Sequence, residues 1–144
     1  MFDERRLERQ SCIFCKIVRK EAPSSIIYED DEVLAFMDIR PVSEGHALVI
    51  SKEHYENIYD VPEELICKIH KVVKHIAEAT REAIKPDGIS IVQQNGTAAN
   101  QDIFHIHVHL IPRFEGQKIH GFGGTSGISR EKLDIIAGQI KSFM

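Results

Sequence analysis

Tryptophan is missing from this 144-residue chain, and cysteine is scarce, with only three residues. An odd number of cysteines argues against a disulfide framework, so we expect the thiols to bind a metal or to be buried. No stretch approaches the roughly 20 consecutive apolar residues that a membrane-spanning helix requires. The sequence therefore predicts a protein that does not enter a membrane.

A long block of positive charge is also missing. The formal net charge is -4, and the basic residues cluster no more densely than in the pairs at 5–6 and 19–20. Proteins that bind nucleic acid present a basic stripe or patch, so we expect no nucleic-acid partner and only a small nucleotide as ligand. Residues 1–9 are rich in charge and lack the apolar core of a secretory signal, which predicts a cytoplasmic location.

The composition that is present is typical of a globular protein. Hydrophobic residues make up 42% and charged residues 28%, which is far from a disordered or fibrous chain. The length predicts one domain over residues 1–144, with residues 1–10 as an N-terminal extension. Five of the nine glycines lie in 116–127, so we expect a flexible loop at 116–128.

Hydrophobic periodicity predicts an α+β domain. Apolar residues recur at helical spacing in 63–84 and again in 129–143, and Asp60 with Glu63 forms a possible capping box for the first helix. Short apolar runs predict strands at 26–28, 33–37, 46–50, 88–94 and 104–111, with a turn at Asn95-Gly96 between the last two. This order indicates an antiparallel sheet of about five strands packed against one long helix and a C-terminal helix.

Three histidines alternate with apolar residues at His105, His107 and His109. In a strand all three rings point to one face, whereas lone histidines on the long helix, such as His70 and His75, have no such pattern. Aligned neutral imidazoles pack poorly, and charged ones repel each other, so the row favours a shared metal or an anionic ligand. His107 lies at its centre and is the best nucleophile, because an imidazole can form a covalent intermediate that water cleaves.

Other polar residues leave alternatives open. Cys12 and Cys15 provide half of a tetrahedral zinc site, although a redox Cys-x-x-Cys preceded by a strand is the rival interpretation. Cys67 lies on the long helix, where we expect it to be a small buried hydrophobe. Asp38 follows a predicted strand and precedes Arg40, so it either caps a turn or accepts hydrogen bonds from a ribose.

Together these motifs resemble the histidine triad (HIT) family. The central motif is His-apolar-His-apolar-His-apolar-apolar at 105–111, and the Cys-x-x-Cys segment at 12–17 looks like the zinc-containing branch. The other matching segments are 36–39, 45–50, 52–54 and Asn95-Gly96 with Gln101. The resemblance implies the HIT-like α+β fold and a homodimer that pairs through the long helix and a central strand.

The resemblance also implies roles for individual residues. His107 becomes nucleotidylated through a ring nitrogen; His109, Asn95 and Gln101 donate hydrogen bonds around the α-phosphate; and His46 lies near the leaving group. Asp38 binds the ribose, and the base is a purine held between apolar side chains at Phe14, Ile17, Phe36, Ile39 and Leu48. One structural zinc ion per chain is bound by Cys12, Cys15, His54 and His105.

The function implied is hydrolysis or transfer at the α-phosphorus of nucleoside phosphoramidates or related conjugates. Three alternatives remain: a dinucleoside polyphosphate hydrolase or phosphorylase, a weakly active nucleotide-binding interaction module, and a zinc-handling protein. The chain also departs from the family pattern, since many relatives carry Ser or Thr at the position of Asp102 and several carry a tryptophan in the tail. A carboxylate at Asp102 could repel a polyphosphate leaving group, favour a cationic amine, or point away from the site.

Overall fold

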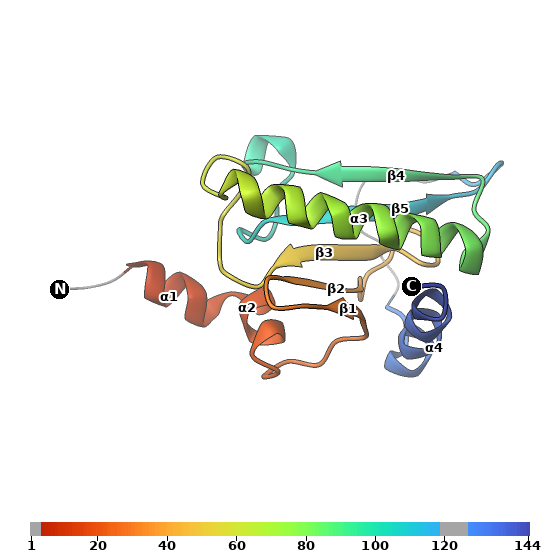
Figure 1. Ribbon diagram of the computed structural model, residues 1–144, viewed down its shortest axis with the longest axis horizontal. Coiled ribbons are helices and arrows are strands. Elements are labelled where there is room, and N and C mark those ends of the chain that lie inside the picture. Colours follow the sequence, from red (N-terminus) through yellow and green to blue (C-terminus); the bar gives the residue numbers. More distant parts are fainter. Residues whose placement is uncertain (1–3, 119–126) are drawn as a thin grey trace.

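The computed structural model describes residues 4–118 and 127–144, and five strands in these ranges form one antiparallel sheet (Figure 1). The strand order is β1-β2-β3-β5-β4. In chain order the elements are α1 (Glu4–Ser11), α2 (Ile13–Val18), β1 (Ile26–Glu29), β2 (Val33–Met37), β3 (Ala47–Ser51), α3 (Glu63–Ile84), β4 (Gly88–Gln93), the 3-10 turn η1 (Thr97–Ala99), β5 (His107–Arg113) and α4 (Arg130–Lys141). The predicted α+β architecture is confirmed.

The alternation of side chains along the strands divides the core into two clusters. Val33, Ala35 and Met37 of β2 face the layer formed by α3 and α4, whereas Leu34 and Phe36 face the opposite side. Helix α3 runs across one face of the sheet, and α4 lies beside β1 (Figure 1). The short helix α2 packs on the other face, where it leaves part of the sheet uncovered for a binding site.

The turn before β3 needs a glycine. Gly45 has a φ of +90°, and a Cβ at this position would come within 3.2 Å of side-chain atoms of both Ile84 and Pro112. The close approach places His46 at the start of β3, where its carbonyl oxygen accepts a hydrogen bond from the Asp38 N–H at 3.0 Å. The same turn therefore joins the ends of β2 and β3 and brings their polar residues together.

Both long helices are confirmed, with α3 at the predicted limits, but two details of α3 differ from the prediction. Its N-cap is Pro62, and the Asp60 carboxylate instead accepts hydrogen bonds from the N–H groups of Glu56 and Asn57 at 3.0 and 2.9 Å. Asp60 thus closes the preceding loop rather than the helix. Cys67 is exposed, because it lies on the solvent side of the helix next to the buried stripe.

The hairpin prediction holds only in part. β4 and β5 pair antiparallel, but η1 lies within their connection, so Asn95-Gly96 is not a tight hairpin turn. β5 begins at His107, three residues later than predicted, and continues through Pro112. Pro112 is tolerated because β3 begins at Ala47, opposite Leu110, so β5 has no partner strand on that side beyond Leu110. Most of the expected loop at 116–128 lies outside the described residues. Within those residues, no helix has the length and apolar character needed to cross a membrane.

Candidate active site

A cavity of about 840 Å³ opens on the face of the sheet opposite α3. It brings together most of the residues that the sequence pointed to for catalysis and nucleotide binding. These lining residues are Phe14, Ile17, Phe36, Asp38, Ile39, His46, Leu48, His107 and His109. Alternation along the strands turns Phe36 of β2, Leu48 of β3, and His107 and His109 of β5 toward the cavity, while α2 and the turn between β2 and β3 supply the others.

His107 is held in one tautomer by its own chain. Its Nδ1 donates a hydrogen bond to the carbonyl oxygen of His105 at 2.8 Å, and burial lowers the pKa of the ring below its ordinary value. The neutral ring therefore carries its proton on Nδ1 and keeps a lone pair on Nε2. Phe14 supports the ring edge-on, with 5.1 Å between ring centroids.

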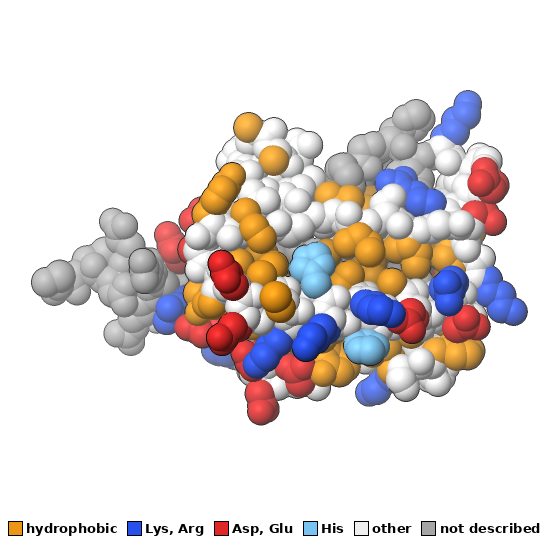
Figure 2. Space-filling view, turned by 45° about the horizontal axis from the view of Figure 1, so that its top comes forward, with side chains coloured by type: hydrophobic (Ala, Val, Ile, Leu, Met, Phe, Trp, Pro, Cys, Tyr) orange, Lys and Arg blue, Asp and Glu red, His pale blue; other side chains and the backbone are white. Residues whose placement is uncertain are grey.

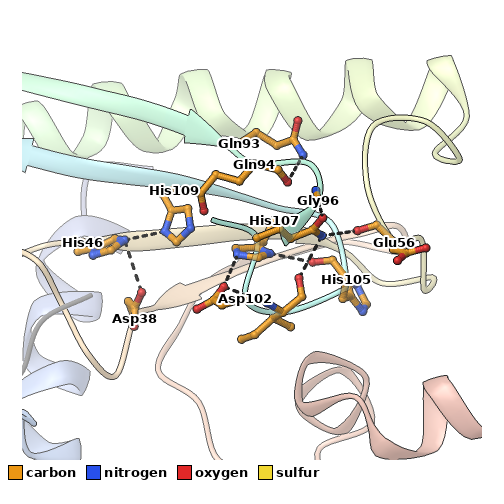
Figure 3. Close-up of polar contacts among 12 residues, drawn as sticks. Asp38, His46, Glu56, Gln93, Gln94, Gly96, Asp102, His105, His107 and His109 are labelled. Atoms are coloured by element: carbon orange, nitrogen blue, oxygen red, sulfur yellow. Dashed lines mark hydrogen bonds and ion pairs between the residues drawn. The ribbon is translucent and has the colours of Figure 1, made fainter. Parts of the chain in front are cut away.

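A second hydrogen-bonded chain fixes His109. The N–H of Val42 donates to His46 Nδ1 at 3.0 Å, so the proton of neutral His46 lies on Nε2, which is 3.0 Å from His109 Nδ1 (Figure 3). Burial lowers the pKa of His46 to about 3 and that of His109 to about 4, which keeps both rings neutral. Because His109 accepts at Nδ1, its own proton lies on Nε2.

The Asp38 carboxylate caps the turn after β2 and also lines the cavity. Its Oδ1 accepts a hydrogen bond from the Arg40 N–H at 2.8 Å, as a turn-capping aspartate does, while Oδ2 lies 3.5 Å from His46 Nε2. Burial raises the pKa of the carboxyl to about 6. The carboxylate nevertheless lines the cavity, so the two interpretations left open by the sequence are compatible.

The structure does not place Asn95 and Gln101 among the lining residues. Asn95 Oδ1 accepts from the Ile58 N–H at 2.8 Å and from the Gln93 amide. Gln101 is buried, and its amide bridges Glu56, Gly96 and Ile103 through hydrogen bonds of 2.7 to 3.1 Å. Gln101 Nε2 donates to the carbonyl oxygens of Glu56 and Ile103, and Asn95 Nδ2 donates to Gln93 Oε1 at 3.1 Å. Since neither residue lines the cavity, their role as donors to a phosphate stays a prediction.

Besides Asp102, five polar residues that line the cavity were not predicted to do so: Ser24, Arg40, Gln94, Asn100 and Arg130. Gln94 and Asn100 lie at the ends of the segment that follows β4, and Arg130 begins α4. A local sequence signal exists only for Gln94 and Asn100, which lie close to the Asn95-Gly96 motif. Arg130 comes from a distant part of the chain, and no local pattern marks it.

Asp102 points toward the site rather than away from it. Its side chain is 76% exposed, and Oδ1 lies 3.7 Å from His107 Nε2 (Figure 3). The Ile103 N–H donates to the same oxygen at 2.9 Å and fixes its direction. A negative charge therefore stands next to the lone pair of the candidate nucleophile.

A separate cluster of thiols and imidazoles lies beside the triad. One ligand atom from each of Cys12, Cys15, His54 and His105 lies within 4.8 Å of the other three. His54 Nδ1 is 3.2 Å from Cys15 Sγ, and His105 Nδ1 is 3.4 and 3.5 Å from the two sulfur atoms. The cluster could hold a metal ion.

The donor set fits a tetrahedral ion such as zinc, which is commonly bound by two thiolates and two imidazoles. His105 Nε2 donates to the carbonyl oxygen of Ser51 at 2.6 Å, which turns the Nδ1 lone pair toward the thiols. Burial raises the pKa of Cys15 to about 12, so a bound cation is what would hold this thiol as a thiolate. A helix, α1, precedes Cys12 where the redox interpretation requires a strand.

Comparison with known proteins agrees with this geometry. The sequence model of the HIT domain family matches residues 19–116 of this chain. The chain is 41% identical to a HIT-like protein of Methanocaldococcus jannaschii over 90% of this chain and 98% of that protein. It is also 41% identical to an adenosine 5'-monophosphoramidase of Saccharomyces cerevisiae, over 72% of this chain and 63% of the yeast protein.

Solved structures give the same result. A zinc-bound histidine triad family protein from Mycobacterium smegmatis superposes with a TM-score of 0.79 at 38% sequence identity, over 94% of this chain and 99% of that one. The match of the family model, the shared fold and the row of three histidines agree. The chain belongs to the HIT domain family.

Proposed function

We propose that this protein is a purine-nucleotide hydrolase or transferase that cleaves nucleoside phosphoramidates, or related nucleotidyl conjugates, at the α-phosphorus. The observation that carries the proposal is the 2.8 Å hydrogen bond from His107 Nδ1 to the carbonyl oxygen of His105. It commits the proton to Nδ1 and leaves the Nε2 lone pair as the nucleophile. The name of the yeast relative, a monophosphoramidase, supports the same chemistry.

The reaction would proceed in two displacements. Nε2 of His107 forms a bond to the α-phosphorus while the leaving group departs, and water then cleaves the nucleotidyl-His107 intermediate. The carbonyl oxygen of His105 stabilises the positive charge on the substituted ring. The Nε2–H group of His109, which also lines the cavity, would donate to a phosphoryl oxygen, where negative charge grows in the transition state.

The cavity walls suit a nucleoside. Apolar side chains on both sides would enclose the flat purine base. These are Phe14, Ile17, Phe36, Ile39 and Leu48. Asp38 would accept hydrogen bonds from the ribose hydroxyls, because a carboxylate that takes one backbone N–H still has free acceptor positions.

The metal cluster would hold one structural zinc ion per chain, with all four positions filled by Cys12, Cys15, His54 and His105. Such an ion would link α2 to the segment before β5. It would also hold the backbone carbonyl group of His105, which accepts the hydrogen bond from His107 Nδ1. The zinc-bound mycobacterial relative supports this assignment. A reducing cytoplasm would keep these thiols available for the metal.

A homodimer is the assembly that we propose. β4 is an edge strand of the sheet, and Ile91 on it is 49% exposed. Figure 2 shows hydrophobic side chains in a band over the face formed by α3 and β4. An apolar patch beside an open strand edge favours pairing with a second copy.

The experiment that tests the function compares His107→Ala with the wild-type protein on an adenosine phosphoramidate. We expect the variant to lose turnover while it still binds AMP in an equilibrium assay, because the cavity walls are unchanged. Rapid quench in alkaline denaturant, where the P–N bond of a nucleotidyl-histidine persists, followed by mass spectrometry of the wild-type protein, should detect one nucleotidyl group on His107. The matched control is His75→Ala, on the exposed face of α3, which should retain full activity. Near-normal turnover in His107→Ala would refute the assignment.

The same assay separates the alternatives. Faster cleavage of a dinucleoside polyphosphate than of the phosphoramidate would favour a polyphosphate hydrolase. Tight nucleotide binding with negligible turnover of both substrates would favour an interaction module.

A further inference from the structure

An arginine from the C-terminal helix lines the nucleotide cavity and is held in a fixed direction. Arg130 is the first residue of α4, and its guanidinium donates to Ser25 Oγ at 2.9 Å. Ser25 is buried, and its hydroxyl donates in turn to Asp134 Oδ1 at 2.6 Å. These two hydrogen bonds orient the Arg130 side chain at the wall of the cavity.

A row of paired residues crosses the floor of the cavity from β5 to β1. Leu48 of β3 pairs with His109 on one side and with Phe36 of β2 on the other. Phe36 in turn pairs with Ile26, the first residue of β1. At the usual strand spacing, three steps across the sheet separate His109 from Ile26 by roughly 14 Å. Arg130 is hydrogen-bonded to the residue before Ile26, so it lies at the end of the cavity opposite the triad.

The proposed binding mode directs the base toward this end. With its phosphorus at His107 and its ribose at Asp38, a nucleotide extends away from β5, and its base lies over Phe36. The outer edge of the base then faces residues 22–24 and the guanidinium of Arg130, all of which line the cavity.

The guanidinium has donors to offer a base. It carries five N–H groups, and the described part of the chain accepts from one of them, so an edge with two parallel N–H groups remains for a ligand. Among the described lining residues the carboxylates are Asp38 and Asp102, which lie 3.5 and 3.7 Å from histidine nitrogens on the triad side. The polar side chain at the base edge is therefore chiefly a donor.

Two parallel donors match a base with two adjacent acceptors. A 6-oxopurine presents O6 and N7 side by side on one edge, and arginine pairs with both atoms at once. A 6-aminopurine presents N7 next to an amino group, which is itself a donor and would face the guanidinium donors. A phosphate on the ribose is a poorer match for Arg130, because it would lie next to the carboxylate of Asp38.

We propose that Arg130 is a specificity-determining residue that selects 6-oxopurine nucleotides, those of guanine and hypoxanthine, over adenine nucleotides. Ser25 is a positioning residue, because it orients the guanidinium. This selectivity rests on the proposed function, since it takes the phosphorus to lie at His107, and it specifies the base of the substrate.

The test compares inosine and adenosine 5'-phosphoramidates, which differ only at C6 and in the N1 proton. We expect the wild-type kcat/KM to favour the inosine compound about tenfold, in the lower part of the range for an arginine–base pair, because Arg130 is only half-buried. Arg130→Met removes the donors and should bring the ratio close to one, mainly by slowing the inosine compound. Arg130→Lys keeps the charge but loses the two-donor edge, so its ratio should fall as well.

The controls separate base selectivity from folding and from catalysis. Arg81→Met, at a residue of α3 whose side chain is 71% exposed, removes the same charge and should keep the wild-type ratio. Turnover of the adenosine compound by Arg130→Met shows that this variant is folded. Calorimetric dissociation constants for IMP and AMP should show the same preference without any turnover.

The outcomes distinguish base selectivity from the function on which it rests. A wild-type ratio near one, or a ratio that Arg130→Met leaves unchanged, overturns the selectivity while the nucleotidyl-His107 mechanism stands. A wild-type ratio kept by Arg130→Lys also overturns it, because charge alone would then be enough. If the wild-type protein cleaves neither compound, the proposed function is wrong, and the IMP-to-AMP binding ratio still decides whether Arg130 selects the base.

Discussion

The hydrogen-bonded chain from Val42 through His46 to His109 makes a prediction that two matched substitutions can separate. Asparagine at position 46 places an oxygen close to the site of His46 Nδ1, so it keeps the acceptor for the Val42 N–H and loses the donor to His109. Glutamine places an amide nitrogen close to the site of Nε2, so it keeps the donor to His109 and loses that acceptor. Each variant thus loses one of the two hydrogen bonds.

The magnitude follows from what His109 loses. In His46→Asn the buried Nδ1 atom of His109 has no donor from position 46, and its proton is free to move from Nε2 to Nδ1. An unsatisfied buried acceptor costs about 1 to 3 kcal/mol, which corresponds to about a fivefold to 150-fold loss in kcat/KM. His46→Gln should stay close to the wild-type value, while both variants lose a similar free energy of unfolding.

The assay is turnover of an adenosine phosphoramidate between pH 6 and 8, with urea denaturation of the same samples. The loss in His46→Asn should be the same across this range, because the pKa values of His46 and His109, about 3 and 4, keep both rings neutral. Equal activity in the two variants, or a larger loss in His46→Gln, would show that His46 does not act by setting the tautomer of His109.

Three further predictions concern the metal site, the loss of stability at low pH and the dimer. Cys15→Ser should lower zinc content from about one ion per chain to near zero and lower the Tm, whereas Cys67→Ser, on the exposed side of α3, should change neither. As pH falls from 6.5 toward 4, the unfolded chain protonates its histidines while the buried rings of the folded state stay neutral, so the free energy of unfolding decreases. Asp38, with its pKa raised to about 6, takes up a proton in the folded state and partly offsets this loss. Asp38→Asn should therefore steepen the fall in unfolding free energy by about 1 kcal/mol per pH unit, measured by urea denaturation between pH 4.5 and 6. Ile91→Asp should shift the protein to monomer in analytical ultracentrifugation if β4 forms the dimer edge, and an unchanged dimer would refute that interface.

Local pattern predicted the regular elements because their causes are local. The apolar spacing of 63–84 is enough to define α3, and the alternation in 33–37 is enough to define β2. The same reasoning failed for Asp60. A sequence pattern does not say which backbone N–H groups a carboxylate will accept from, and Asp60 accepts from those of Glu56 and Asn57, in the loop before the helix. It also failed for Cys67, because residue type alone does not say how far a helix is covered on each side.

The candidate site shows the same division. Alternation placed the rings of His107 and His109 on the cavity side of β5, and family resemblance pointed to the apolar wall. Gln101 has the right chemistry for phosphate binding, yet its amide nitrogen donates to the backbone carbonyl oxygens of Glu56 and Ile103, contacts that no local sequence pattern reveals. The amide of Asn95 pairs with that of Gln93.

The sequence by itself determined which face of β5 carries the imidazoles, because side chains alternate along any strand whatever surrounds it. Only the tertiary structure decided the state of each ring. The carbonyl group of His105 sets the position of the proton on His107, and His46, in the turn before β3, sets that on His109. Burial keeps both rings neutral. Tautomer and charge depend on neighbours and on exclusion of water, and these exist only once the strands are paired.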